Sequence, residues 1–128
     1  MVKIAILTSA NQWFCQYAPD LSQRLNDAPI YYRASEIADK FDILFILGCH
    51  EIVDIKVLSR NKYNLVIHES NLPRGKGWAP LFWQIIEGKN EITFSMIEAT
   101  AEIDAGPIYM QKKLYLTGFE LNSEIRKK

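Results

Sequence analysis

The stretch from Tyr63 to Gly88, YNLVIHESNLPRGKGWAPLFWQIIEG, decides the fold. It opens on an apolar run, Leu65 to Ile67, which predicts a strand buried on both faces and ending at His68. A turn rich in proline and glycine follows, and Pro80 stands where the first turn of a helix tolerates a missing N–H group. The apolar spacing beyond it predicts a helix that stops at Gly88.

Further apolar runs on either side of this stretch predict the rest of a sheet. Upstream, three runs separated by helical segments are typical of a parallel sheet with right-handed crossovers: Val2–Leu7, Ile30–Tyr32 and Ile43–Leu47. Downstream, Ile92–Ile97 alternates and Ile108–Leu116 has an extended pattern, which predicts an antiparallel, hairpin-like pair. We therefore expect an α/β, Rossmann-like fold with a mostly parallel central sheet, an antiparallel addition in the C-terminal half, and helices on both faces.

The helices are less sharply marked than the strands. Aromatic and leucine residues recur at helical spacing from Trp13 to Leu25, but Pro19 interrupts them. Two alternatives stay open: a kinked helix from about Gln12, or a helix that begins at Pro19 after an aromatic loop. Shorter helical segments are predicted at Ala34–Lys40, Glu51–Leu58 and Glu120–Lys128.

Length and composition limit the classes of function. The 128 residues predict one domain with a real core, and the 15 basic and 15 acidic residues balance. This balance argues against a nucleic-acid or anionic-membrane partner held by bulk charge. No apolar run reaches the length of a membrane span, and the N-terminus lacks a signal-peptide pattern. The two cysteines have no metal or redox spacing, so we expect a cytoplasmic protein without a metal.

His68 is the leading candidate for chemistry. Histidine side chains ordinarily titrate near neutral pH, which suits a general base or a cationic stabiliser of a developing oxyanion. The alternative is a hydrogen-bonded histidine that only ends a strand. Asp104 is a candidate to orient that imidazole, although an aspartate before Ala-Gly is most often an ordinary turn residue.

Three ordered motifs carry a family resemblance: HESNLP at 68–73, GWAP at 77–80 and DAGPI at 104–108. They resemble the folate-dependent formyltransferases, the family of methionyl-tRNA formyltransferase, glycinamide ribonucleotide transformylase and the nucleotide-sugar N-formyltransferases. The family pattern is Asn-x-His-Pro-Ser-Leu-Leu-Pro, then Gly-x-x-Pro, then Asp-Ala-Gly about three dozen residues further on. The first sixty residues match that family in architecture only.

The resemblance implies transfer of a formyl group from 10-formyltetrahydrofolate to a primary amine. By position, His68 matches the family's catalytic histidine, Asp104 its catalytic aspartate, and Ser70 the serine that supports the site. The family's pterin ring hydrogen-bonds main-chain groups of two loops, one after the third strand and one before the aspartate. The corresponding residues here are Glu51 and Val53, and Ala99, Thr100, Ala101 and Ile103.

Two further segments are most similar to the short formyltransferases of cell-surface sugar, or lipopolysaccharide, biosynthesis. These are RGKGWAP at 74–80 and the tail GFEL at 118–121. The resemblance implies that the amine belongs to a nucleotide-linked amino sugar. The zero net charge offers no phosphate-binding stripe, which makes tRNA the alternative substrate rather than the leading one. A homodimer is left open.

Departures from the family pattern motivate two rival hypotheses. Val66 stands where the family has a catalytic asparagine, and losing one oxyanion donor typically costs about 3 kcal/mol. Either Ser70, Asn71 or His50 supplies the missing bond, or the protein is slow or inactive. The first rival is therefore a non-catalytic folate- or nucleotide-binding module. The second is a bare Rossmann-like domain that awaits a partner or a missing C-terminus.

Two smaller departures complete the comparison with the family. Glu69 replaces a proline, which we expect to matter little. Family members continue well past this length, so we expect residues 1–128 to form the single N-terminal catalytic domain, truncated at its C-terminus.

Overall fold

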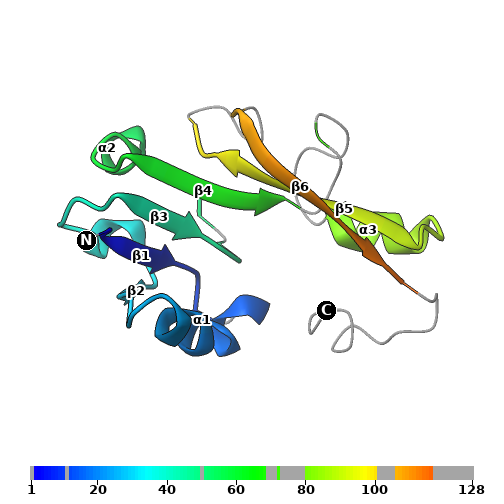
Figure 1. The fold of residues 1–128 in the computed structure, drawn as a ribbon, viewed down its shortest axis with the longest axis horizontal. Coiled ribbons are helices and arrows are strands. Elements are labelled where there is room, and N and C mark those ends of the chain that lie inside the picture. The colour runs from blue at the N-terminus through cyan, green and yellow to red at the C-terminus, as the bar shows by residue number, and fades with distance from the viewer. Residues whose placement is uncertain are drawn as a thin grey trace. The chain divides into compact units, whose positions relative to one another are not determined.

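The computed structural model describes residues 2–10, 12–49, 51–68, 72, 80–100 and 106–116 (Figure 1). Its six-stranded sheet has the strand order β2-β1-β3-β4-β5-β6. The chain divides into two compact units. Unit 1 comprises residues 1–66 and 98–101, and unit 2 comprises residues 67–97 and 102–128.

Unit 1 is built on a parallel sheet. Its strands are β1 (Ile4–Leu7), β2 (Ile30–Tyr31), β3 (Ile43–Ile46) and the first part of β4 (Tyr63–His68). β1 pairs in parallel with both β2 and β3, and β3 pairs in parallel with β4. The predicted α/β fold with a mostly parallel sheet is therefore confirmed.

The helices of unit 1 settle the open alternative near Pro19. A 3-10 turn, η1 (Trp13–Gln16), precedes α1 (Ala18–Arg24), and Pro19 lies in the first turn of α1. Proline is tolerated there because the first N–H groups of a helix have no intrahelical acceptor. The second alternative, a helix that begins near Pro19 after an aromatic segment, is the one observed.

Two shorter helical elements follow, η2 (Ala34–Glu36) and α2 (Ile55–Leu58). η2 lies in the segment Ala34–Lys40, where a short helical segment was predicted. α2 begins four residues later than the predicted start at Glu51, because the Asp54 side chain accepts a hydrogen bond from Lys56 N at 2.8 Å and caps the helix.

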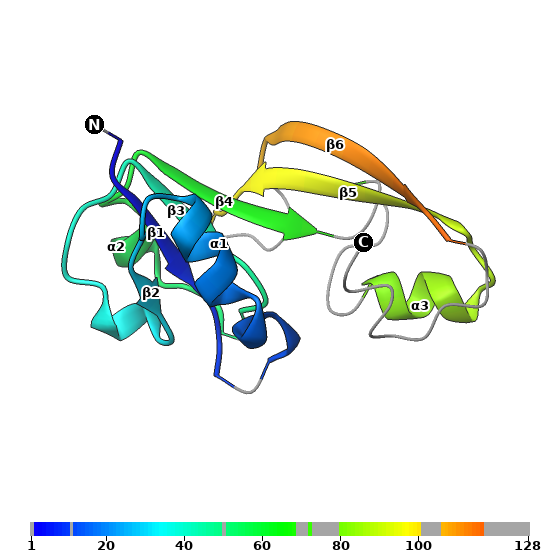
Figure 2. The same cartoon turned by 60° about the horizontal axis from the view of Figure 1, so that its bottom comes forward.

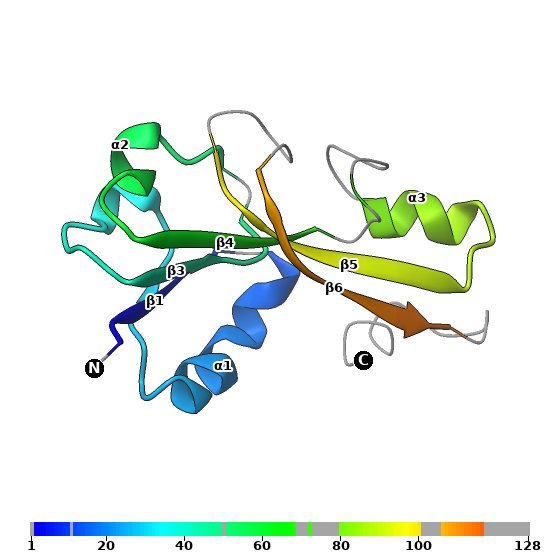
Figure 3. The same cartoon turned by 45° about the horizontal axis from the view of Figure 1, so that its top comes forward.

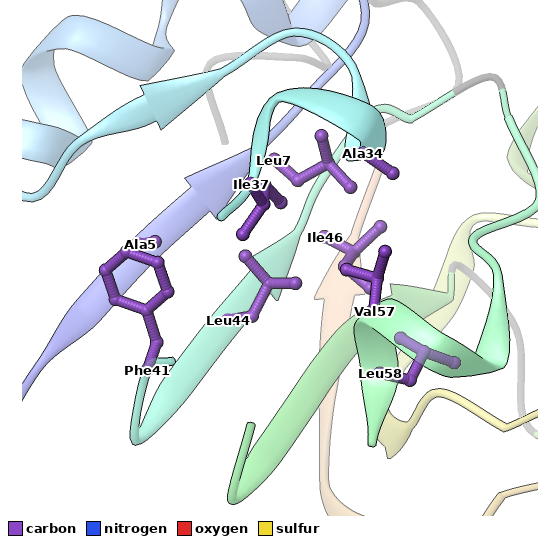
Figure 4. Packing of buried hydrophobic residues seen from close by; sticks show 9 residues of the cluster. All are labelled: Ala5, Leu7, Ala34, Ile37, Phe41, Leu44, Ile46, Val57 and Leu58. Carbon is purple, nitrogen blue, oxygen red and sulfur yellow. The ribbon is translucent and has the colours of Figure 1, made fainter. Parts of the chain in front are cut away.

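The core of unit 1 lies on one face of the parallel strands, where β1 and β3 meet η2 and α2 (Figure 4). Alternation along β1 directs Ala5 and Leu7 to this cluster and Ile6 to the opposite face. α1 and α2 lie on opposite sides of these strands (Figure 3). The members of the cluster are Ala5, Leu7, Ala34, Ile37, Phe41, Leu44, Ile46, Val57 and Leu58.

Unit 2 contains an antiparallel pair and one helix. β5 (Glu91–Glu98) pairs antiparallel with β6 (Ile108–Tyr115), with an irregularity between Met96 and Ile97. α3 (Pro80–Ile86) packs on this pair through Leu81, which belongs to a cluster with Ile92 (Figure 2). The predicted antiparallel addition is confirmed, and the predicted helix after the glycine-rich turn is present.

One burial prediction was wrong. Leu65 is buried in β4, but Ile67 is 44% exposed, so this strand is not buried on both faces along its length. A short apolar run does not by itself distinguish full burial from half burial, and a sheet that includes antiparallel strands can leave one face open to water. The helix predicted over 120–128 lies outside the described residues.

Gly48, at the carboxyl end of β3, is a position where the backbone requires glycine. Its φ is +57°, and a Cβ added there would lie 2.6 Å from the Cβ of Phe14. We expect Gly48→Ala to lower the free energy of unfolding by about 2–4 kcal/mol, because a left-handed backbone and a steric clash are combined.

Gly88 provides the matched control for that variant. Its φ is +81°, but nothing lies within 4 Å of an added Cβ. Gly88→Ala should therefore lower the free energy of unfolding only through the left-handed backbone, by about 1–2 kcal/mol. Urea unfolding of both variants measures the difference. Equal losses would show that Phe14 moves aside at no cost.

Candidate active site at the carboxyl ends of the strands

Open α/β sheets bind ligands outside the carboxyl ends of their strands. In unit 1 that edge carries Thr8 and Ser9 after β1, and the loop Gly48–Val53 after β3, of which His50 lies outside the described residues. The loop after β3 includes the two residues predicted there to bind the pterin ring, Glu51 and Val53.

The loop after β3 has its own side-chain links. Ser9 Oγ donates to Cys49 Sγ at 3.8 Å, and Cys49 Sγ donates to the Glu51 carbonyl oxygen at 3.6 Å. Burial raises the pKa of the Cys49 thiol, so at neutral pH it remains the protonated donor that this geometry requires. Because this pKa is raised in the folded state, the stability that the thiol contributes is lost as the pH rises through it.

Two main-chain N–H groups of this loop have no partner among the described residues. Within the described residues, no hydrogen bond engages the backbone N–H groups of Glu51 and Val53. Backbone donors without a partner among the described residues suit the main-chain recognition of a pterin ring that the family resemblance implies.

The second predicted pterin loop follows β5. Ala99 N donates to the Asn64 carbonyl oxygen at 2.8 Å, and Thr100 is exposed. Ala99 and Val53 both pack against the buried cluster of unit 1. The structure therefore brings one residue from each predicted pterin loop onto the same cluster. Ala101 and Ile103 lie outside the described residues.

A buried polar network that sequence reasoning missed anchors the start of the loop after β5. The Asn64 backbone N–H donates to Glu98 Oε2 at 2.8 Å, and the Asn64 side-chain amide donates to the Leu58 carbonyl oxygen at 2.8 Å. Asn61 Nδ2 donates to Asn64 Oδ1 at 2.9 Å. The signal available in the sequence was an asparagine, Asn64, inside an otherwise apolar strand. Buried hydrogen-bond networks of this kind favour one local geometry, because an unpaired polar group in the interior is costly.

His68 is the last residue of β4, the strand end at which the sequence placed it, and it is only 7% exposed. Ser70 and Asp104, the other predicted catalytic residues, lie outside the described residues, so their pairing with His68 remains a prediction. Val66 precedes His68 by two positions and packs against the buried cluster of unit 1. At the position of the family's asparagine this chain therefore presents an apolar side chain with no donor.

The described residues hold no group of three or more histidine, cysteine, aspartate or glutamate side chains arranged to bind a metal ion. Over the same part of the chain, the helices are too short or too polar to span a membrane. Both cysteines are free thiols.

Comparison with known proteins decides the family. The model of the formyl transferase family matches residues 22–128, which is most of the chain. The chain belongs to the formyl transferase family. Methionyl-tRNA formyltransferase of Prochlorococcus marinus is 34% identical over 76 residues, which make up 59% of this chain and 22% of that relative. The match therefore covers only 22% of the length of that methionyl-tRNA formyltransferase.

Three solved structures have the same fold. Methionyl-tRNA formyltransferase from Clostridium thermocellum superimposes with a TM-score of 0.76 at 20% identity, over 91% of this chain and 54% of that one. A Mycobacterium tuberculosis protein with a suggested sugar N-formyltransferase role superimposes with a TM-score of 0.73 at 21% sequence identity. The match covers 99% of this chain and 60% of that one. HypX from Aquifex aeolicus in complex with tetrahydrofolic acid superimposes with a TM-score of 0.70 at 20% sequence identity. The match covers 90% of this chain and 22% of that one.

Proposed function

We propose that this formyl transferase family member binds 10-formyltetrahydrofolate and transfers its formyl group to the primary amine of a nucleotide-linked amino sugar. The observation that carries the proposal is the family match over residues 22–128. A methionyl-tRNA substrate is the alternative within the same chemistry. A cytoplasmic location and a homodimer remain predictions.

The described residues fit a folate co-substrate. Two loops predicted to hold the pterin ring pack against one cluster through Val53 and Ala99, and the backbone N–H groups of Glu51 and Val53 have no partner within the described part of the chain. A pterin presents both donors and acceptors along one edge, which main-chain groups can read without distinctive side chains. The tetrahydrofolic acid bound by HypX, a protein of the same fold, supports this choice.

His68 and Asp104 would carry the acid–base chemistry. As the substrate amine attacks the formyl carbon, a protonated His68 imidazole would stabilise the charge that develops on the formyl oxygen. Asp104 would hold the imidazole and help to move a proton from the attacking amine to the leaving nitrogen of the folate. His68 is buried at the end of β4, where an interaction between its side chain and a neighbouring charge is stronger than in water.

The class of amine is proposed on two grounds. The M. tuberculosis protein with the suggested sugar N-formyltransferase role matches 99% of this chain. In addition, basic and acidic residues balance at 15 each, whereas a tRNA substrate favours a basic binding surface. The curated methionyl-tRNA formyltransferase keeps tRNA as the second candidate.

A paired experiment tests the proposal. Isothermal titration with tetrahydrofolate measures binding, and a formyl-transfer assay with 10-formyltetrahydrofolate measures turnover on a nucleotide-linked amino sugar and on methionyl-tRNA. We expect folate binding, together with faster transfer to the sugar. Absence of folate binding would overturn the proposal.

The rival function is a folate- or nucleotide-binding module without catalysis. Val66 favours it, because the family's oxyanion donor is missing from that position. Binding of tetrahydrofolate without turnover on either amine would establish this rival.

A further inference from the structure

Hydrogen bonds tie the loop after β3 to the loop after β1, the adjacent strand, and to the loop after β2, the next strand beyond it. Ser9, which follows β1, donates to Cys49. Ala34, which follows β2, donates its backbone N–H to Glu51 Oε1 at 2.6 Å. Since β1 lies between β2 and β3 in the sheet, these links join the carboxyl ends of three adjacent parallel strands.

The bond from Ala34 to Glu51 is the strongest of these links. It is a short, charge-assisted hydrogen bond between residues 17 positions apart. This bond involves only the side chain of Glu51. The Glu51 carbonyl oxygen accepts a hydrogen bond from Cys49 Sγ. The side chain of Glu51 thus anchors the loop, while the N–H groups of Glu51 and Val53 have no partner among the described residues.

We propose that the Glu51 carboxylate is a positioning residue, which holds the main chain of residues 51–53 in its binding conformation before folate arrives. The inference rests on the proposed function, because it assigns this loop to the pterin ring. A loop fixed in advance loses less conformational freedom on binding, so the anchor increases folate affinity without touching the reacting atoms. Glu51→Gln keeps an acceptor oxygen, whereas Glu51→Ala removes it.

The simpler explanation is that Glu51 only stabilises η2, whose first residue is Ala34. Glu36 allows the two explanations to be separated. Its Oε1 accepts hydrogen bonds from Tyr32 N at 3.3 Å and Arg33 N at 3.1 Å, which belong to the same turn as η2 and not to the loop after β3. Glu36→Ala is therefore a matched control, because it weakens η2 and leaves the Glu51 anchor in place.

The experiment measures tetrahydrofolate binding by titration, and KM and kcat where turnover is found. Glu51→Ala should raise the Kd and the KM for folate about tenfold, as expected for loss of one charge-assisted hydrogen bond, with kcat nearly unchanged. Glu51→Gln should recover most of the affinity, and Glu36→Ala should bind like the wild type. Amide hydrogen exchange at Ile52 and Val53, measured without folate, should accelerate in Glu51→Ala and stay unchanged in Glu36→Ala.

The outcomes separate the positioning role of Glu51 from the proposed function. If the wild type binds folate and Glu51→Ala binds equally well, the positioning role is overturned and the proposed function stands. The positioning role is also overturned if Glu36→Ala weakens binding as much as Glu51→Ala. If the wild type does not bind folate, the proposed function fails, and the assignment of Glu51 to a folate loop fails with it.

Discussion

Replacing His68 by alanine is expected to lower the kcat of formyl transfer by about 10²- to 10⁴-fold, the usual contribution of a positioned acid or base. The side chain is buried at the end of β4, and the proposed mechanism assigns its imidazole to the formyl oxygen. Steady-state kinetics at saturating 10-formyltetrahydrofolate measures the loss. The Kd for tetrahydrofolate should stay near the wild-type value, because the predicted pterin contacts belong to the two main-chain loops.

Added imidazole provides the control for the His68→Ala variant. The deletion leaves a cavity, and free imidazole entering it should restore part of the lost turnover, whereas simple unfolding would not be rescued. His68→Gln, which keeps most of the volume, should be as inactive as alanine. Wild-type kcat in the glutamine variant would remove His68 from the mechanism.

Asp104→Asn should cost at least about a hundredfold in kcat, since it removes the charge that would hold the imidazole while keeping the size of the side chain. The same assay measures it. Asp42→Asn is the matched control: Asp42 Oδ2 accepts a hydrogen bond from Lys3 N at 2.8 Å, a link between β1 and β3 that takes no part in the chemistry. We expect full turnover in the control, and unchanged turnover in Asp104→Asn would contradict the mechanism.

The fold was largely predictable because its signals are local. Apolar runs such as Ile43–Leu47 mark β3, and Pro19 marks the first turn of α1 by the N–H group that it lacks. The exposure of Ile67 was not predictable, since a run of three apolar residues carries no information about which face is covered. The start of α2 depends on the side chain of Asp54, a capping choice that the apolar pattern does not reveal.

The candidate site was predictable only where it coincides with strand ends. His68 lies at the end of β4 as the sequence indicated. The link from Ala34 to Glu51 could not be predicted, because it joins loops 17 residues apart that meet only when β1, β2 and β3 pair. The need for glycine at position 48 is also partly non-local, since the clash with the Cβ of Phe14 adds to the positive φ.

Val66 remains the departure that most affects the expected rate. Its side chain packs against the buried cluster of unit 1, so it supplies no hydrogen bond to an oxyanion. Ser70, Asn71 and His50 are the candidates within sequence reach to replace the family's asparagine. If none of them does, the kcat should be about 10²- to 10³-fold lower than that of a site with all its oxyanion donors.

The central claim is that the loops after β3 and β5 hold a folate, and an NMR titration of the ¹⁵N-labelled chain with tetrahydrofolate tests it most directly. We expect saturable shifts, with a common Kd, in the amide signals of Glu51, Val53, Ala99 and Thr100, while the amide signals of α1 stay unmoved. Saturable shifts confined to other elements, or no shifts at millimolar tetrahydrofolate, would contradict it.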